Sequence, residues 1–137
     1  MMLHNFFFDF FIYKTLNNTN NEAKKIYKYQ KRNLAIFTLK QILGRGRLNR
    51  KWISNKGDLT CSFLINKKLD ADKVGGINLF ITYNILLLLK KIIPDIDFKI
   101  KWPNDIYVDH KKLGGILIET SITKKEIDTF IIGIGIN

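Results

Sequence analysis

The stretch from Lys101 to Thr120, KWPNDIYVDHKKLGGILIET, carries the local signals that decide the fold. Its β-branched and aromatic residues come in short runs, which predict strands at 98–102, 106–108 and 112–120. The polar residues at 109–111, between the last two runs, are typical of a hairpin turn. Because short connections favour antiparallel neighbours, this part of the chain predicts an antiparallel sheet.

The sequence on either side extends this sheet and adds two helices. A strand is predicted at 129–136, after a polar hairpin tip at 123–126. A long helix is predicted at 73–93 and ends just before Pro94. Its predicted core stripe consists of Val74, Ile77, Ile81, Ile85 and Leu88.

The N-terminal part repeats the same kinds of signal. Thr19 and Glu22 form the capping-box pattern that begins a helix. Strands are predicted at 6–13, 34–39 and 59–65, with a long polar loop at 41–58. The order of elements predicts an α+β fold, with a mixed, largely antiparallel sheet flanked by helices.

Length and composition narrow the class of protein. With 137 residues, of which 46% are hydrophobic, the chain suits one globular domain over 1–137. Apolar runs such as 85–89 are too short to span a bilayer, and residues 1–13 lack the basic start and cleavage site of a signal peptide. A single cysteine and two distant histidines exclude a disulfide framework and a zinc site. We therefore expect a cytoplasmic protein that does not associate with membranes.

The net charge of +11 would attract any polyanion at low salt. The lysines are scattered along the chain, whereas Arg45, Arg47 and Arg50 cluster and leave only Arg32 elsewhere. Arginine offers a planar fork to carboxylate or phosphate, so the cluster indicates an anion-binding loop. A basic nucleic-acid-binding module is an alternative interpretation of the same charge.

Four short motifs indicate a bound ligand, and the first two of them indicate an anion. Gly44-Arg45-Gly46-Arg47 joins glycines, which let the backbone approach a ligand, to guanidinium groups. The segment 101–105 places Lys, Asn and Asp at one strand end, which suits nucleotide phosphates and Mg²⁺. In the strand that begins at Lys112, Gly114 and Gly115 indicate a bulge or the close approach of a ligand or another backbone. Gly133 and Gly135 clear one face of the last strand, which suits a strand that covers a ligand.

The sequence offers no recognisable nucleophile setting, no Ser-His-Asp spacing and no pair of catalytic carboxylates. Its cations and glycines fit a different reaction. In that reaction the substrate's own carboxylate attacks the α-phosphate of a nucleotide, and the protein holds and neutralises the reacting oxygens.

The motifs resemble, in this order, those of biotin protein ligases. These enzymes use ATP to activate biotin as biotinyl-5'-AMP and transfer it to a lysine of a carboxylase carrier protein. The matching blocks are Asn18-Thr19-Asn20, Gln41 with 44–52, 101–105 with 112–119, and 133–137. The resemblance runs from about Phe8 to the last residue and implies a catalytic fold similar to that of class II aminoacyl-tRNA synthetases.

The resemblance also implies roles for individual residues. It implies biotin contacts from Asn18, Thr19, Asn20, Gln41, Arg45, Gly46, Arg47, Lys112 and Gly115. Lys112 and Arg47 would be catalytic, with Lys112 bridging the biotin carboxylate and the α-phosphate. ATP or adenylate contacts are implied for Arg50, Trp52, Lys101, Asn104, Asp105 and Asn137, with Mg²⁺ on the phosphates near Asp105.

The chain also departs from the family pattern. Asn18 replaces a usual Ser, Asn49 a common Gly, and Asp58 and Thr60 the usual Asn and Tyr. We expect neither the N-terminal winged helix of repressor-type members nor the C-terminal β-domain, and so no DNA partner. The expected partner is the biotin carboxyl-carrier protein of a carboxylase, and a homodimer is one open oligomeric state. Two further alternatives are a biotin-binding remnant without catalysis and a lipoate ligase-like enzyme.

Overall fold

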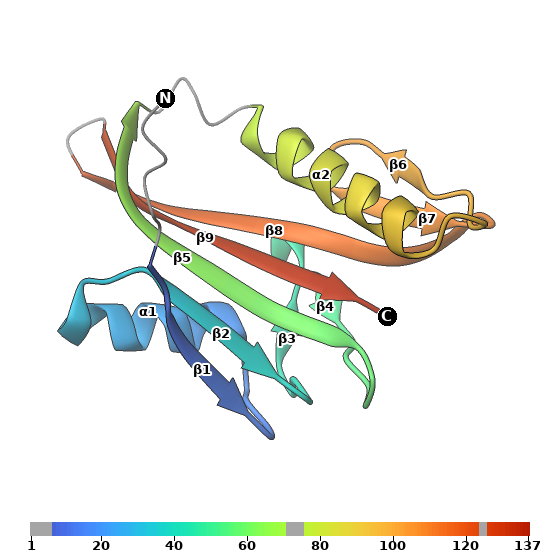
Figure 1. Ribbon diagram of the computed structural model, residues 1–137. Coiled ribbons are helices and arrows are strands. Elements are labelled where there is room, and N and C mark those ends of the chain that lie inside the picture. Colours follow the sequence, from blue (N-terminus) through green and yellow to red (C-terminus); the bar gives the residue numbers. More distant parts are fainter. Residues whose placement is uncertain (1–6, 71–75, 124–125) are drawn as a thin grey trace.

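The computed structural model describes residues 7–70, 76–123 and 126–137. Seven strands form one sheet in the order β1-β2-β5-β9-β8-β7-β6, and β3 and β4 form a separate two-stranded ribbon (Figure 1). The elements are β1 (Asp9–Tyr13), α1 (Thr19–Gln30), β2 (Leu34–Thr38), β3 (Gly44–Arg45), a 3₁₀ turn (Arg47–Asn49), β4 (Lys51–Trp52), β5 (Leu59–Asp70), α2 (Ile77–Ile92), β6 (Lys99–Lys101), β7 (Asp105–Val108), β8 (Lys111–Thr123) and β9 (Glu126–Ile136).

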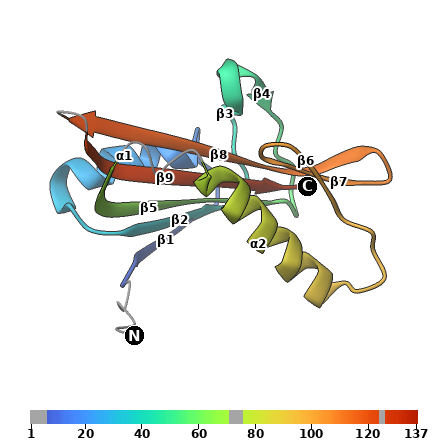
Figure 2. The same ribbon diagram turned by 90° about the horizontal axis from the view of Figure 1, so that it is seen from above.

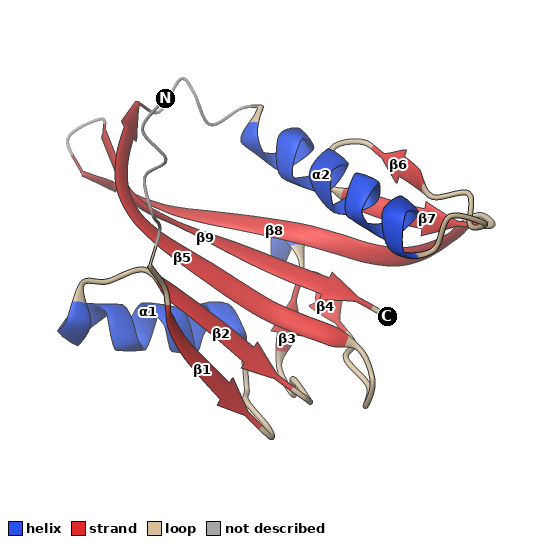
Figure 3. Ribbon diagram, in the orientation of Figure 1, coloured by secondary structure: helices blue, strands red, loops and turns tan. Residues whose placement is uncertain are grey.

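The sheet is mixed but largely antiparallel. Only β1 and β2 pair in parallel, and the other neighbours in the described sheet pair antiparallel (Figure 3). The long strands β5, β9 and β8 form its centre, and all three are longer than the sequence predicts. The α+β prediction, with a mixed sheet flanked by helices, is therefore confirmed.

The two helices cover opposite faces of the sheet, as seen from above in Figure 2. Alternation along β9 explains this, because successive side chains of a strand point to opposite faces. Phe130 and Ile132 pack in the core cluster that contains Leu86 of α2, whereas Ile131 packs in the cluster that contains Ala23 of α1. The β3–β4 ribbon stands on the α1 side of the sheet (Figure 2).

Helix α1 begins where the sequence predicts, but its cap is a different residue. The side chain of Asn18 accepts a hydrogen bond from the backbone N–H of Asn21 at 3.0 Å, so Asn18 is the N-cap. The expected capping box of Thr19 and Glu22 is wrong. The Thr19 hydroxyl bonds to Gln41, and Glu22 accepts from the Tyr13 hydroxyl at 3.4 Å.

Helix α2 confirms the predicted helix but shifts its core stripe. Leu88 is 56% exposed, whereas Leu86 and Thr82 are buried. The residues that pack inwards span an arc from Ile81 to Leu86 around the helix axis, and Leu88 lies just outside this arc, at its solvent edge. Ile81 and Ile85 pack against the core as predicted, and Val74 lies outside the described residues.

The short hairpins follow the predictions closely. Val108 pairs with Lys111, so Asp109 and His110 form a two-residue turn, and both have positive φ, of 45° and 64°. At the next hairpin Thr123 pairs with Glu126, and the two residues between them lie outside the described part. The same holds for Phe6, with which the first predicted strand begins; the observed β1 begins at Asp9.

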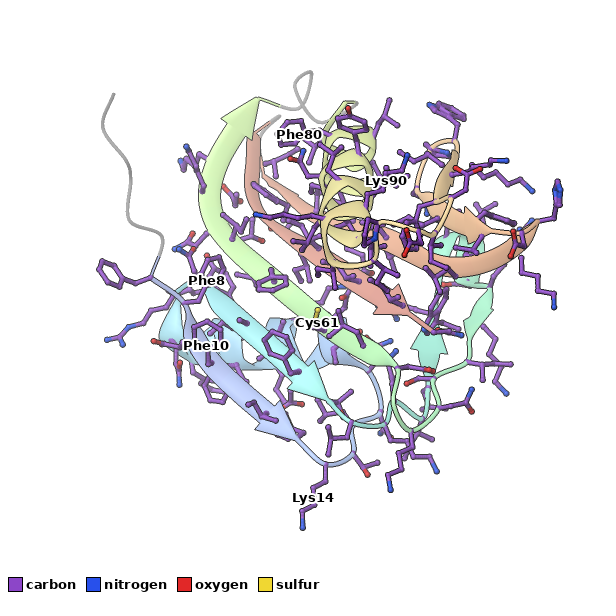
Figure 4. All side chains as sticks on the ribbon, turned by 45° about the vertical axis from the view of Figure 1, so that its right-hand side comes forward. Phe8, Phe10, Lys14, Cys61, Phe80 and Lys90 are labelled. Atoms are coloured by element: carbon purple, nitrogen blue, oxygen red, sulfur yellow. The ribbon has the colours of Figure 1, made fainter. Side chains whose placement is uncertain are left out.

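The burial of the single cysteine decides its chemistry. Cys61 on β5 is 2% exposed, and burial raises the pKa of its thiol to about 12, so it packs as a neutral core residue (Figure 4). No helix within the described ranges is long and apolar enough to cross a membrane.

Candidate functional site

A cleft of about 660 Å³ is lined by residues of the β3–β4 ribbon, the start of α1 and the sheet. Every site residue predicted from the sequence lines it. These residues are Asn18, Thr19, Asn20, Gln41, Arg45, Gly46, Arg47, Arg50, Trp52, Lys101, Asn104, Asp105, Lys112, Gly115 and Asn137. They come from the start of α1, the loop 41–52, β6, the turn that follows it, β7, β8 and the end of β9.

One end of the cleft is a buried network of hydrogen bonds around the start of α1. The backbone N–H of Thr19 donates to Gln41 Oε1 at 2.8 Å, and the Thr19 hydroxyl lies 3.2 Å from the same oxygen. Ser62 Oγ lies 2.7 Å from Thr19 Oγ1 and also bonds to Asn20 Oδ1. All of these side chains are buried, so their orientations are fixed before any ligand arrives.

Glu119 of β8 extends this network to the part of the loop that carries Arg45, Arg47 and Arg50, residues 44–50, called the arginine loop below. Its carboxylate accepts from Asn20 Nδ2 at 2.7 Å and from Arg45 Nη2 at 2.9 Å. On the outer side it pairs with Lys24 Nζ at 3.1 Å. Burial alone would raise the pKa of Glu119, but the hydrogen bonds from Asn20 and Lys24 and the charges of Lys24 and Arg45 lower it below the usual value. Glu119 is therefore ionised at neutral pH.

Lys112 lines the cleft beside an acid and an aromatic ring. Its Nζ pairs with Asp105 Oδ1 at 2.8 Å and lies 5.3 Å from the centre of the Trp52 ring. Gly115 makes room for this arrangement, because a Cβ there would lie 3.2 Å from Lys112 Nζ and 3.3 Å from Asp105 Oδ1. The site thus holds one ammonium group close to a single carboxylate.

Arg47 is joined to the sheet through Asn104. Its Nη1 donates to Asn104 Oδ1 at 3.2 Å, and Asn104 Nδ2 donates to the carbonyl of Ile116 at 2.7 Å. The backbone N–H of Ile116 in turn donates to the Asn104 carbonyl at 3.0 Å. Asn104 is itself buried, so it anchors the loop guanidinium to β8 while lining the cleft.

The glycines of β9 serve neighbouring side chains. A Cβ on Gly133 would lie 2.6 Å from Asn20 Oδ1, and a Cβ on Gly135 would lie 2.5 Å from the Trp52 ring. The bare face of this strand is therefore filled by Asn20 and Trp52, so the strand supports the residues that line the cleft. Gly114 meets another backbone, since a Cβ there would lie 3.0 Å from the Gly135 carbonyl oxygen, and the pairing register of β8 with β7 also shifts beside it.

The opposite end of the cleft is exposed. Trp102 is 78% exposed, and Lys101 places its Nζ 5.4 Å from the centre of the Tyr107 ring. The backbone N–H of Asn137 donates to the carbonyl of Leu113 at 2.8 Å, while its side chain is exposed. Arg50 is also exposed there. These side chains are positioned by the strand ends and are accessible to solvent.

Sequence reasoning missed Ser62 and Glu119 as site residues. Both act through contacts between distant parts of the chain, since Glu119 and Asn20 are 99 residues apart. A usable signal was the single acid at the end of the apolar run 116–118. Among the described residues there is no group of three or more His, Cys, Asp or Glu side chains that could hold a metal ion.

Similarity to known proteins identifies the family of the chain. The model of the biotin/lipoate A/B protein ligase family matches residues 11–137. The chain belongs to this family. Chloroplastic biotin–protein ligase 1 of Arabidopsis thaliana is 36% identical over 71% of this chain and 27% of its own length. The predicted resemblance to biotin protein ligases is therefore confirmed.

Two solved structures of biotin protein ligases share the fold. That of Leishmania major, in complex with biotinyl-5-AMP, has a TM-score of 0.79 and 26% identity, and the match covers 94% of this chain and 57% of that one. That of Aquifex aeolicus, in complex with biotin and ATP, has a TM-score of 0.72 and 33% identity over 96% of this chain and 53% of that one. The chain thus spans little more than half of these structures and about a quarter of the plant enzyme.

Proposed function

We propose that this chain carries the adenylation site of a biotin protein ligase. The carboxylate of biotin attacks the α-phosphate of ATP, pyrophosphate leaves, and biotinyl-5'-AMP remains in the cleft. The observation that carries the proposal is a single cleft lined by a buried polar network, by Lys112 paired with Asp105, and by exposed cations. The solved relatives with biotinyl-5-AMP or with biotin and ATP support the same substrates.

The buried end suits the ring system of biotin. A ureido ring carries one carbonyl and two N–H groups, and it is recognised by short amide and hydroxyl side chains held in fixed directions. Asn18, Thr19, Asn20 and Gln41 supply such groups, and their burial excludes water that would compete for the ring. Arg45 and Gly46 would close over this end, because both line the cleft on the β3 side.

Lys112 and Arg47 act on the charge that develops in the reaction. Both side chains line the cleft, and a preorganised cation stabilises negative charge on the attacking and bridging oxygens. Lys112 is bound to Asp105 in the absence of ligand. When biotin and ATP bind, their carboxylate and phosphate oxygens would take over part of the contact that Asp105 makes with the Lys112 ammonium group. The lysine side chain would then need little movement.

The exposed end suits the nucleotide. Arg50, Trp52, Lys101, Asn104 and Asn137 would contact ATP or the adenylate, with Trp52 offering a ring face and the cations offering phosphate contacts. Asp105 is the one acid that lines the cleft within the described chain. A Mg²⁺ ion held mostly by phosphate oxygens needs only one or two carboxylates, so Asp105 fits as its protein ligand, and the ion would neutralise phosphate charge.

The second half-reaction transfers biotin to a lysine of a biotin carboxyl-carrier protein, in the cytoplasm. The family supports this partner. The amine of the acceptor lysine attacks the activated carbonyl, and AMP leaves with its phosphate. This step needs the carrier protein at the open side of the cleft.

The direct test is biotin-dependent exchange of pyrophosphate into ATP by the purified chain, because this assay reports adenylation without any carrier protein. We expect exchange with biotin and magnesium, and none with lipoate in place of biotin. Exchange driven by lipoate would assign the chain to the lipoate branch of the family. A folded chain that binds biotin without exchange would be a binding remnant.

A further inference from the structure

We propose that Glu119 is a positioning residue, which acts through Asn20 and Arg45 to fix the hydrogen-bond directions and the loop position at the buried end of the cleft. The inference rests on the proposed function for its ligand, but its geometry stands without a ligand. Glu119 is not among the residues that line the cleft. It therefore acts only through residues that do.

The contacts of Glu119 join three segments that are far apart in the sequence. One oxygen accepts from Asn20 Nδ2 of α1, and the other accepts from Arg45 Nη2 of β3, at 2.7 and 2.9 Å. Arg45 Nη2 also donates to Asn21 Oδ1 at 2.9 Å, so the guanidinium lies between the helix and β8. The carboxylate therefore holds the start of the arginine loop against the start of the helix.

The same carboxylate fixes the orientation of the Asn20 amide. An ionised carboxylate can only accept hydrogen bonds, so Asn20 must turn its nitrogen towards Glu119 and its oxygen towards Ser62. The hydroxyl of Ser62 has one proton, and Asn20 Oδ1 is an acceptor, so that proton points to Asn20. Ser62 Oγ is then an acceptor for the Thr19 hydroxyl, whose other acceptor is Gln41 Oε1.

A backbone N–H group fixes the orientation of the Gln41 amide, at the other end of this hydrogen-bond network. The N–H of Thr19 donates to Gln41 at 2.8 Å, so the facing atom of Gln41 must be its oxygen. The nitrogen of Gln41 is then turned towards Gly44, where a Cβ would lie 2.7 Å away from it. The amide orientations of Asn20 and Gln41, which both line the cleft, are thus set by protein contacts alone.

Glu119→Gln is the sharpest variant, because it keeps the shape of the side chain and removes its charge. Its own amide can face Asn20 through either atom, so the direction of the network is no longer determined. Asp128→Asn on β9 is the matched control, since it makes the same change from carboxylate to amide on the neighbouring strand. Lys24→Gln is a second control, since it removes only the outer partner of Glu119.

Two measurements on the full chain test the proposal. The first is the rate of chymotrypsin cleavage after Leu48, which is 88% exposed in the arginine loop, without ligand. We expect Glu119→Gln to be cut several times faster than the wild-type chain and both controls. The second is calorimetric titration with biotin and separately with ATP. We expect Glu119→Gln to weaken biotin binding roughly tenfold or more while ATP binding changes less than about twofold.

The outcomes separate this inference from the proposed function. Cleavage and biotin affinity unchanged in Glu119→Gln would overturn the positioning role while leaving biotin ligation intact. A wild-type chain that binds no biotin, together with faster cleavage of Glu119→Gln, would reject the proposed function and keep the positioning of the loop. If Glu119→Gln does not unfold cooperatively, Arg45→Gln tests the positioning role instead, because it removes the other partner of the same ion pair. It should speed cleavage after Leu48 in the same way.

Discussion

The two ends of the cleft are built by different means. At the buried end Thr19, Asn20 and Gln41 are 8% exposed or less, and each is held by other side chains of the network. At the other end Lys101 and Trp102 are exposed. The difference teaches that hydrogen bonds fix the side chains at the buried end without a ligand, whereas Lys101 and Trp102 remain open to solvent. Preorganisation of this kind lowers the entropic cost of binding at the buried end only.

The largest effect is expected from removing Lys112, which lines the cleft together with residues of both ends. Lys112→Ala should lower the rate of biotin-dependent adenylation by about 10²–10³, because it removes a preorganised positive charge from the reacting oxygens. Pyrophosphate exchange measures this. Lys111→Ala, next to it at the exposed turn of the hairpin, is the control and should retain exchange. An active Lys112→Ala variant would remove the catalytic role of Lys112.

The second prediction concerns a substitution that disturbs only the buried end of the cleft. Gly133→Ala should destabilise the chain by about 1–3 kcal/mol, because its Cβ would lie 2.6 Å from Asn20 Oδ1 in a packed network. It should also weaken biotin binding and leave ATP binding nearly unchanged. Chemical denaturation and calorimetry measure the two effects. Gly76→Ala, where a Cβ meets nothing within 4 Å, is the control.

The third prediction concerns how the stability contributed by Glu119 depends on pH. The lowered pKa of Glu119 means that its ionised form stabilises the folded chain at neutral pH. This contribution is complete above the unfolded pKa of about 4.3 and is lost as the pH falls through the lower folded value. The free energy of unfolding of the wild-type chain should therefore exceed that of Glu119→Gln near neutrality, and the gap should narrow in acid. A gap that stays constant with pH would contradict the ionised network.

The smallest effect concerns the exposed end. Lys101→Ala should weaken ATP binding only about two- to fivefold, because an exposed cation contributes on the order of 0.2–1 kcal/mol. Added salt should reduce this difference further. Lys99→Ala is the control, since its Nζ pairs with Asp97 outside the cleft. A loss of more than a hundredfold would mean that this end is as preorganised as the buried one.

The sequence predicts well what depends on neighbours in the chain. The hairpin at Asp109 and His110, the start of α1 and the fold class all follow from local patterns. Local patterns fail where a distant residue competes. Thr19 matches a capping pattern, but its hydroxyl is used by Gln41, so Asn18 caps the helix. Leu88 continues an apolar spacing, but the sheet selects the neighbouring face of α2.

The site shows the same limit. The motifs identify the residues that line the cleft, since each lies in a short recognisable segment. They do not reveal Glu119 or Ser62, whose partners are 99 and 42 residues away. They place Gly133 and Gly135 beside a ligand, and both line the cleft, but they do not reveal that Asn20 and Trp52 occupy the space above them. Which side chain occupies an empty strand face depends on tertiary packing, and a single sequence does not encode it locally.

The tight turn at Asp109 and His110 offers a starting point for protein engineering. Both residues have positive φ, and neither is glycine, so each adopts the left-handed conformation at a cost of about 1–2 kcal/mol. Asn-Gly is the pair that such a two-residue turn prefers. A chain with Asp109→Asn and His110→Gly should melt several degrees higher, with an unaltered cleft. That added heat tolerance would let more disruptive substitutions near Lys112 be studied in a chain that still folds.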